Sequence, residues 1–248
     1  MTVISGLISE TGRIDVHSHL LPNVDDGCQS LEESLACARL MVQAGYTHSF
    51  CTPHIWPSLP GNTAELIPDR VARLQRELHD ANISLRLFPG GELNMTDQTP
   101  HLARQDVVTY AMAGQYAIID LWAQTLPPYF DASIRHLQSM GLKVILAHPE
   151  RMRAVQDNPG LAGQFSEMGI LLQGNLQCLG DPPDSATRRL AEKYLAEDRY
   201  FLLGSDLHNL ASLPIRLKGL RRAIEAVGEE KVWQLTSENP RKLLAEAD

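Results

Sequence analysis

The residues best suited to chemistry begin with His17 and His19, a His-x-His pair near the start of the chain. Ile14 and Val16 alternate with polar residues there, the period of two that is typical of a β-strand. This period places both imidazoles on one face, where together they can hold a metal ion. A turn containing Asp26 follows directly. Such a pair alone is more often structural than metal-binding, so its interpretation depends on the rest of the chain.

Imidazole and carboxylate groups recur at the ends of other predicted strands. We expect seven strands, over residues 13–19, 47–51, 84–88, 116–121, 143–147, 170–172 and 200–204, and six of them end in His, Asp or Glu. The candidates are His17, His19, Asp26, His54, Glu92, Asp120, His148, Asp206 and His208. We interpret the remaining histidines as structural, from their places in predicted helices, a strand or a polar loop: His48, His79, His101 and His136.

Predicted helices alternate with these strands, over residues 31–44, 68–79, 130–140, 185–196, 214–227 and 231–235, with a last short one from 239. Ser30 and Glu33 form a capping box before the first helix. The alternation indicates an α/β fold with a parallel sheet. Polar groups at nearly every strand end favour a distorted seven-stranded TIM-like barrel, whose strand ends converge, over an open doubly wound sheet with one switch point. We find no linker and expect one domain over residues 1–248.

Composition excludes several classes of protein. The 248 residues carry a net charge of −8, which argues against a general nucleic-acid or anionic-membrane binder. The four cysteines show no C-x-x-C spacing, as expected of reduced thiols in a cytoplasmic protein. Residues Met1 to Leu7 lack a basic region or a long apolar segment, so we expect no signal peptide, and no run has the length of a membrane span.

The nine candidates outnumber the four ligands of a single zinc ion, which indicates two or three divalent ions. Imidazole and carboxylate without thiolate suit manganese, iron or zinc and disfavour copper(I). Three divalent ions against four carboxylates leave a charge of +2, the complement of a phosphate monoester dianion. With two ions the site is neutral, and a substrate with a C–N bond competes better. Clustered ions can acidify a water nucleophile and clamp phosphoryl oxygens.

Arg151 lies three residues after His148. Its guanidinium can bind two phosphate oxygens in a bidentate fork, and a loop at the mouth of a barrel can aim it inward. The alternative is a salt bridge to Glu150 or a helix end. With His148 so close, we favour a role in phosphate binding and catalysis. The donor of the leaving-group proton is open between a water on the ions and Asp206.

Together these residues resemble the polymerase and histidinol phosphatase (PHP) superfamily, most closely the bacterial manganese-dependent protein-tyrosine phosphatases of capsule and exopolysaccharide synthesis. The matching segments cover nearly the whole chain in order. They are 15–19 (DVHSH), 24–27 (VDDG), 52–54 (TPH), 91–92 (GE), 147–151 (AHPER), 205–209 (SDLHN) and 238–242 (ENPRK).

The resemblance implies a distorted seven-stranded barrel with three metals and a bacterial tyrosine kinase of polysaccharide export as the phosphorylated partner. It implies that Arg151 binds the substrate phosphate. The implied ligand sets are His17, His19, Glu92 and Asp206 for one metal, Asp26, His54 and His208 for a second, and Glu92, Asp120 and His148 for a third.

The chain departs from the family pattern at two places. Asp120 stands where the family usually has Glu, one methylene longer, which bears on the third metal. The family often has an Arg after Leu210, whereas here the next one is Arg216, so a substrate contact is lost or moved.

Competing functions are a phosphatase of the histidinol-phosphate type, a metal-dependent amidohydrolase and a regulator that binds phosphotyrosine without turnover. A nuclease fits the acidic chain poorly.

Overall fold

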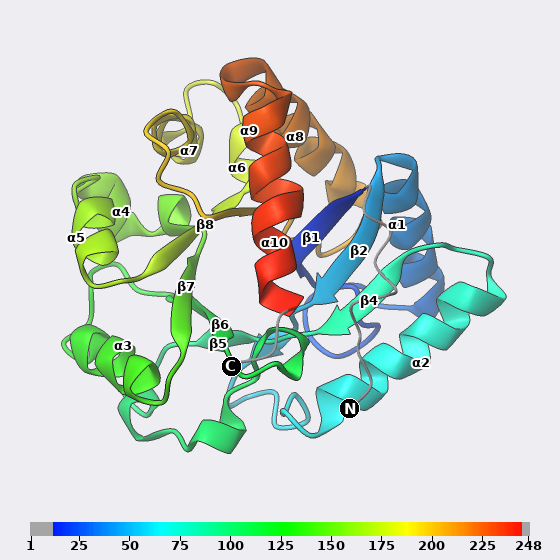
Figure 1. The fold of residues 1–248 in the computed structure, drawn as a ribbon, viewed down its shortest axis with the longest axis horizontal. Helices are drawn as coiled ribbons and strands as arrows, with labels where there is room; N and C mark the ends of the chain where they lie inside the picture. Colours follow the sequence, from blue (N-terminus) through cyan, green and yellow to red (C-terminus); the bar gives the residue numbers. More distant parts are fainter. Residues whose placement is uncertain (1–11, 245–248) are drawn as a thin grey trace.

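The computed structural model describes residues 12–244, so Met1 to Leu7, where we expect no signal peptide, lie outside the described residues. The strands are short and parallel to their neighbours. They are β1 Arg13–Ser18, β2 Tyr46–Cys51, β3 His54–Ile55, β4 Arg86–Pro89, β5 Glu92–Asn94, β6 Tyr116–Asp120, β7 Lys143–Ala147, β8 Leu171–Asn175 and β9 Leu202–Gly204. They pair in the orders β1-β2-β4 and β3-β5-β6-β7-β8-β9 (Figure 1).

The α/β class with parallel sheets is confirmed, but the strands do not follow the predicted set of seven. The second and third predicted strands are each followed by a separate short strand, β3 and β5. Pro53, which has no N–H for a strand ladder, lies in the first break, and Gly90 and Gly91 lie in the second. The described pairings divide into two sheets, linked at one place by an isolated bridge between Ser18 and Leu207.

The helices surround the strands in Figure 1. They are α1 Leu31–Gln43, α2 Leu66–Asp80, α3 Phe130–Ser139, α4 Arg153–Asp157, α5 Leu161–Glu167, α6 Leu176–Gly180, α7 Ala186–Ala196, α8 Leu213–Val227, α9 Glu229–Trp233 and α10 Asn239–Arg241, with a π-helical stretch η7 at Gln234–Glu238. Short 3₁₀ turns lie at Thr99–His101, Arg104–Asp106, Tyr110–Met112, Pro149–Arg151, Leu210–Ser212 and Lys242–Leu244.

All of the predicted helices are present, whereas α4, α5 and α6 were not predicted. The Ser30 hydroxyl accepts the N–H of Glu33, as the capping box requires. The Glu33 carboxylate, however, accepts the N–H of Gln29 at 3.0 Å, one residue earlier than expected. The predicted strand over 170–172 is in fact longer, so Gln173 and Asn175 belong to β8 rather than to a following loop.

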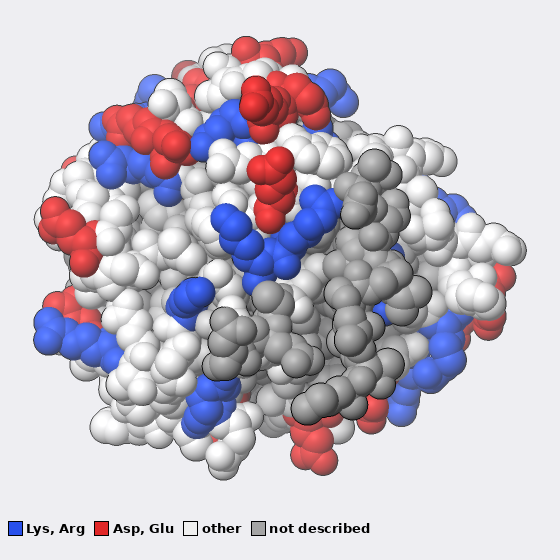
Figure 2. All heavy atoms as spheres, in the orientation of Figure 1, with Lys and Arg blue, Asp and Glu red and all other residues white. Residues whose placement is uncertain are grey.

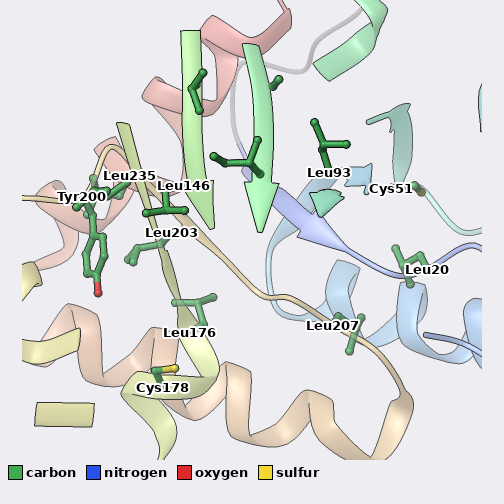
Figure 3. Packing of buried hydrophobic residues seen from close by; sticks show 14 of the residues in the cluster. Leu20, Cys51, Leu93, Leu146, Leu176, Cys178, Tyr200, Leu203, Leu207 and Leu235 are labelled. Carbon is green, nitrogen blue, oxygen red and sulfur yellow. The ribbon is translucent and has the colours of Figure 1, made fainter. Parts of the chain in front are cut away.

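The apolar core consists of two clusters of buried side chains. In the larger one, Figure 3 shows Leu146 of β7 and Leu203 of β9 near Leu176 and Cys178 of α6, so strands and helices share one packed layer. The smaller cluster comes mainly from strand residues such as Ile14. Burying one aliphatic side chain contributes roughly 1.5–3 kcal/mol. This packing therefore fixes the strands, and with them the positions of the strand ends.

The helical segment from α9 to α10 lies across the beginnings of the strands, in front of them in Figure 1. Arg13, the first residue of β1, donates to the hydroxyl of Thr236 at 2.6 Å. The Ser237 hydroxyl donates to the carbonyl of Gly12 at 2.9 Å. Because this segment contacts the start of β1 and, through Asn239 and the carbonyl of Phe201, the chain just before β9, it leaves the C-terminal ends of these strands available for a site.

Charged side chains of both signs are interspersed over the face seen in Figure 2, and several Lys and Arg side chains lie close to an acidic one near its centre. The net charge of −8 is therefore not gathered on that face.

The four cysteines are buried and free. Within residues 12–244, no helix combines the length and the apolar character needed to cross a membrane.

The contact between α6 and α8 generates a test of the packing. A Cβ added to Gly219 would lie 1.7 Å from the carbonyl oxygen of Leu176, and a backbone atom cannot move aside cheaply. We expect Gly219→Ala to lower the free energy of unfolding by about 3 kcal/mol. Gly163→Ala is the control, because its Cβ meets only Arg199 at 3.8 Å. In urea denaturation the control should be neutral or stabilised by up to about 1 kcal/mol. Equal stability of the two variants would contradict the packing.

Candidate metal centre

The nine predicted residues meet in one site, which is formed by the C-terminal ends of β1 and β6, the first residues of β3 and β5, and the loops after β1, β7 and β9. His17 comes from β1, His54 from β3, Glu92 from β5 and Asp120 from β6. The loops after β1, β7 and β9 supply the others. Seven of the nine are buried. The side chain of His208 is 20% exposed and that of Asp26 57%, so the site opens to solvent on their side.

The carboxylate of Glu92 is at the centre of this site. Its Oε2 atom lies 2.8 Å from His54 Nδ1, 3.3 Å from His17 Nε2 and 3.5 Å from His19 Nε2. Its Oε1 atom lies 3.1 Å from His148 Nε2. One fully buried carboxylate therefore contacts four imidazoles from different parts of the chain, which is the arrangement expected of a bridging ligand.

Asp206 is the second carboxylate that contacts the His-x-His pair. Its Oδ1 lies 3.4 Å from His17 Nε2 and 3.3 Å from His19 Nε2. Its Oδ2 accepts hydrogen bonds from Arg151 Nη1 at 2.7 Å and Asn175 Nδ2 at 2.8 Å. Both carboxylate oxygens thus have defined partners.

The backbone is strained at two of these residues. Asp206 has a φ of 53° and His148 a φ of 33°, in the left-handed region that residues other than Gly rarely adopt. Such conformations persist where the surrounding structure holds them, often at functional sites. At Asp206 the N–H donates to the carbonyl of His17 at 2.7 Å, and at His148 the N–H donates to that of Gln173 at 2.8 Å.

Arg216 also holds the Asp206 loop. Its guanidinium is buried and donates to the carbonyl of Ser205 at 2.8 Å, to that of Asp206 at 3.0 Å and to that of Ser212 at 2.9 Å. The sequence left open whether Arg216 restores the substrate contact that the family often has after Leu210. In the structure its donors are committed to backbone carbonyls, which indicates that it fixes the loop.

Three imidazoles are oriented by an acceptor at Nδ1: His17 by Gln173 Oε1 at 2.9 Å, His19 by Asp25 Oδ2 at 2.7 Å and His208 by the Asp206 carbonyl at 2.9 Å. These acceptors hold the proton on Nδ1 and leave Nε2, which faces the site, free to bind a cation. Sequence reasoning assigned no role to Gln173 or Asp25. The signal for Gln173 was its place on a strand next to the site, and that for Asp25 its place beside Asp26.

The charges at the site are strongly coupled. Burial alone would lower the pKa of His17, but the negative charges of Glu92 and Asp206 outweigh it and raise this pKa to about 9. Burial alone would raise the pKa values of Glu92 and Asp206, yet the imidazoles hold both well below their usual range. The same negative potential would attract a cation.

Several buried atoms of the site make no well-aligned hydrogen bond within residues 12–244, even though His54 Nδ1 and Glu92 Oε2 lie only 2.8 Å apart. They are both ring nitrogens of His54, Glu92 Oε2 and Asp120 Oδ2. Burial and the charge of Glu92 raise the pKa of Asp120. Buried polar groups without a partner are costly and rare. A divalent cation could bind one ring nitrogen of His54 together with a carboxylate oxygen each of Glu92 and Asp120, so the residues present fit the metals that the sequence implies.

The potential ligand atoms form four overlapping groups: His19, Asp26, His54 and His208; His17, His19 and Glu92; His17, His148 and Asp206; and His54, Glu92 and Asp120. The first group contains the whole second set implied by the resemblance. The third set differs, because Glu92 and Asp120 group with His54. His148 lies 4.0 Å from Asp120 but 3.1 Å from Glu92.

The acidic turn is fixed against His19 by Gly27. A Cβ at Gly27 would lie 2.3 Å from the carbonyl oxygen of His19. The Gly27 N–H donates to Asp25 Oδ1 at 2.9 Å, and the N–H of Cys28 donates to the His19 carbonyl at 3.0 Å. Glycine therefore lets the turn approach closely enough for Asp25 to orient His19 and for Asp26 to face the site.

Arg151 is directed toward the site, as its interaction with Asp206 shows. The alternative partner, Glu150, is buried and accepts hydrogen bonds from the Asn175 N–H and the Tyr200 hydroxyl instead. The side chain of Arg151 is 40% exposed, so it can meet a ligand that enters from solvent.

The four histidines interpreted as structural lie outside these ligand groups. His48 is buried and its Nδ1 lies 2.8 Å from the Thr47 hydroxyl. His136 contacts the carbonyl of Leu102. His79 and His101 are exposed. The histidines predicted at strand ends and those interpreted as structural thus lie in different surroundings in the structure.

A parallel α/β fold with buried imidazoles and carboxylates at its strand ends defines a protein with a site suited to divalent metals. The chain belongs to the CpsB/CapC family of capsular polysaccharide synthesis, whose profile matches residues 13–245.

Named relatives span most of the chain. CapC of Staphylococcus aureus is 27% identical over 219 residues, covering 88% of this chain and 86% of CapC. The tyrosine-protein phosphatase YwqE of Bacillus subtilis is 28% identical over 237 residues, covering 93% of this chain and 91% of YwqE. A crystal structure from work on YwqE and on CpsB of Streptococcus pneumoniae, described as metal-dependent tyrosine phosphatases, matches with a TM-score of 0.85 at 24% identity, covering 94% of this chain and 95% of that one. The last likeness establishes the fold.

The Asp25–His19 contact generates a test of the site. Burial alone would raise the pKa of Asp25, but the hydrogen bond from His19 lowers it to about 2, so this carboxylate is charged at neutral pH. We expect Asp25→Asn to weaken the binding of Mn²⁺ by about 10- to 100-fold, because the charge that orients the imidazole is lost. Isothermal titration calorimetry would measure this change.

Asp80→Asn is the matched control, since Asp80 is exposed and contacts only the exposed His79 among the described ion pairs. Its affinity for Mn²⁺ should equal that of the parent protein. An Asp25→Asn variant that binds as tightly as the control would show that Asp25 does not orient a ligand.

Proposed function

We propose that this chain is a metal-dependent phosphatase that removes phosphate from tyrosine side chains of proteins. The observation that carries the proposal is the buried Glu92 carboxylate among four imidazoles, next to a half-exposed Arg151. Such a site offers several cation positions and a guanidinium for a phosphate dianion. The names of the relatives support the same activity.

We propose two to three divalent ions, with manganese favoured over iron and zinc because the donors are imidazole and carboxylate without thiolate. The proposed ligands are those that the resemblance implies: His17, His19, Asp26, His54, Glu92, Asp120, His148, Asp206 and His208. Bound ions would supply positive charge for the phosphoryl oxygens and lower the pKa of a water nucleophile.

Arg151 is the proposed phosphate-binding and catalytic residue. Its guanidinium can hold two phosphoryl oxygens, while the hydrogen bond from Nη1 to Asp206 fixes its position. Asp206 Oδ2 already accepts hydrogen bonds from Arg151 and Asn175, so it acts as an anionic acceptor. We therefore favour a water molecule over Asp206 as the source of the proton that the leaving oxygen takes up.

The finer points of the proposal follow from the family. The proposed substrate is a phosphotyrosine protein, in particular a bacterial tyrosine kinase of polysaccharide export, in the cytoplasm. We propose that residues 1–248 act as one domain and that the two sheets form one distorted barrel. The bridge between Ser18 and Leu207 supports the barrel, because it joins the end of β1 to the chain after β9.

Removal of the metals tests the proposed chemistry. Chelation followed by dialysis should abolish hydrolysis of p-nitrophenyl phosphate, and added Mn²⁺ should restore it. His17→Ala should lower the rate by about 10²-fold or more, since charge stabilisation of the transition state is lost. His79→Ala, at an exposed histidine outside the site, should keep the parental rate. Full activity after chelation would refute the proposal.

The choice of substrate separates the related functions. We expect faster turnover of a tyrosine-phosphorylated peptide than of histidinol phosphate by the metal-loaded protein. The opposite preference would indicate a small-molecule phosphatase. Tight binding of the peptide without phosphate release would instead indicate a regulator that recognises phosphotyrosine.

A further inference from the structure

Two tryptophans lie at the entrance of the site. Trp56 stacks on the imidazole of His54, with ring centroids 4.0 Å apart. Trp122 follows Asp120 at the end of β6, and its ring contacts that of Trp56 edge to face at 6.3 Å. Trp122 is 65% exposed, more than any other large apolar side chain among residues 12–244. The indole of Trp122 therefore offers a large flat apolar surface to a ligand at the entrance of the site.

Arg151 lines two cavities. The first, of about 300 Å³, is lined by Trp122 together with Asp120 and His148. The second, of about 380 Å³, is lined by polar side chains, among them Gln177 and the metal-ligand candidates Asp26, Asp206 and His208. The first cavity alone combines metal-ligand candidates, the guanidinium and an aromatic face. Of the two cavities that Arg151 lines, the one on the Trp122 side therefore offers an aromatic partner to an organic group attached to phosphate.

The guanidinium of Arg151 connects the two parts of the first cavity. Its Nη1 is hydrogen-bonded to Asp206, and its Cζ lies 6.0 Å from the centre of the Trp122 ring. A phosphate held by Arg151 and the ions thus leaves its ester group next to the indole. A flat aromatic ring can pack on or against that indole, whereas a short alkyl group covers little of it.

We propose that Trp122 is a specificity-determining residue that binds the aromatic ring of the substrate and so selects aryl over alkyl phosphate monoesters. Trp56 positions it through their edge-to-face contact. This inference rests on the proposed function and names the side chain that would make the site prefer phosphotyrosine to phosphoserine. Aromatic pairs gain about 0.5–1.5 kcal/mol beyond the area that they bury, which corresponds to about 2- to 12-fold. Because the apolar area buried by the ring adds to this, the discrimination should be about tenfold.

The test compares two stable phosphonates, benzylphosphonate and ethylphosphonate, by calorimetric titration of the Mn²⁺-loaded protein. Trp122→Ala should weaken binding of benzylphosphonate by about 5- to 20-fold and that of ethylphosphonate by less than about twofold. Trp122→Phe, which keeps an aromatic ring, should retain most of the preference. Gln177→Ala, in the second cavity, is the control and should leave the ratio of the two affinities unchanged.

Metal content and circular dichroism of each variant establish that it is folded and loaded. The role of Trp122 would be overturned if Trp122→Ala left the affinities for both phosphonates unchanged or lowered both equally. The phosphatase proposal would still stand in that case if the parent protein hydrolysed p-nitrophenyl phosphate. If Gln177→Ala changed the ratio of the two affinities more than Trp122→Ala does, the aromatic ring of the ligand would lie in the second cavity, and the role of Trp122 would be overturned as well. Failure of the loaded parent to bind either phosphonate or to hydrolyse any ester would instead reject the phosphatase.

Discussion

The structure depends on keeping one carboxylate, Glu92, fully buried among four imidazoles. Taking an isolated charge out of water costs several kcal/mol, so such a group persists only where opposite charge surrounds it. The imidazoles that surround Glu92 arrive from β1, β3 and the loops after β1 and β7, which are remote in the sequence. Their convergence makes the strands, the loops and the charge of the site mutually dependent. Divalent cations at this place would complete the compensation that the imidazoles begin.

The elements around this centre serve mainly to hold its loops. Two ligand candidates, His148 and Asp206, adopt left-handed backbone conformations that their neighbours must maintain. Arg216 holds the carbonyl of Asp206, and Gly27 lets the acidic turn approach His19. On the opposite side, the α9–α10 segment covers the strand beginnings. One end of the fold is thus covered and structural, whereas the other carries the candidate site, as in β/α barrels.

Much of this could be predicted because strand periodicity and strand-end position are local signals. These signals grouped His17 with Glu92 and Asp206 as candidate ligands, and they left His79 and His136 out of that set. Several short elements were not predicted because they contain too few residues to show a recognisable hydrophobic period. They are the strands β3 and β5 and the five- to seven-residue helices α4, α5 and α6. The roles of Gln173, Asp25 and Arg216 also escaped, since a hydrogen bond to a ligand or to a strained carbonyl depends on tertiary contacts that no local pattern records.

The most direct test of the central claim is anomalous X-ray diffraction at the manganese edge from crystals grown with Mn²⁺. We expect two or three anomalous peaks clustered around Glu92, each within coordination distance of an imidazole nitrogen of His17, His54 or His148. Crystals soaked in millimolar Mn²⁺ that show no peak there, with the side chains placed as described, would contradict it.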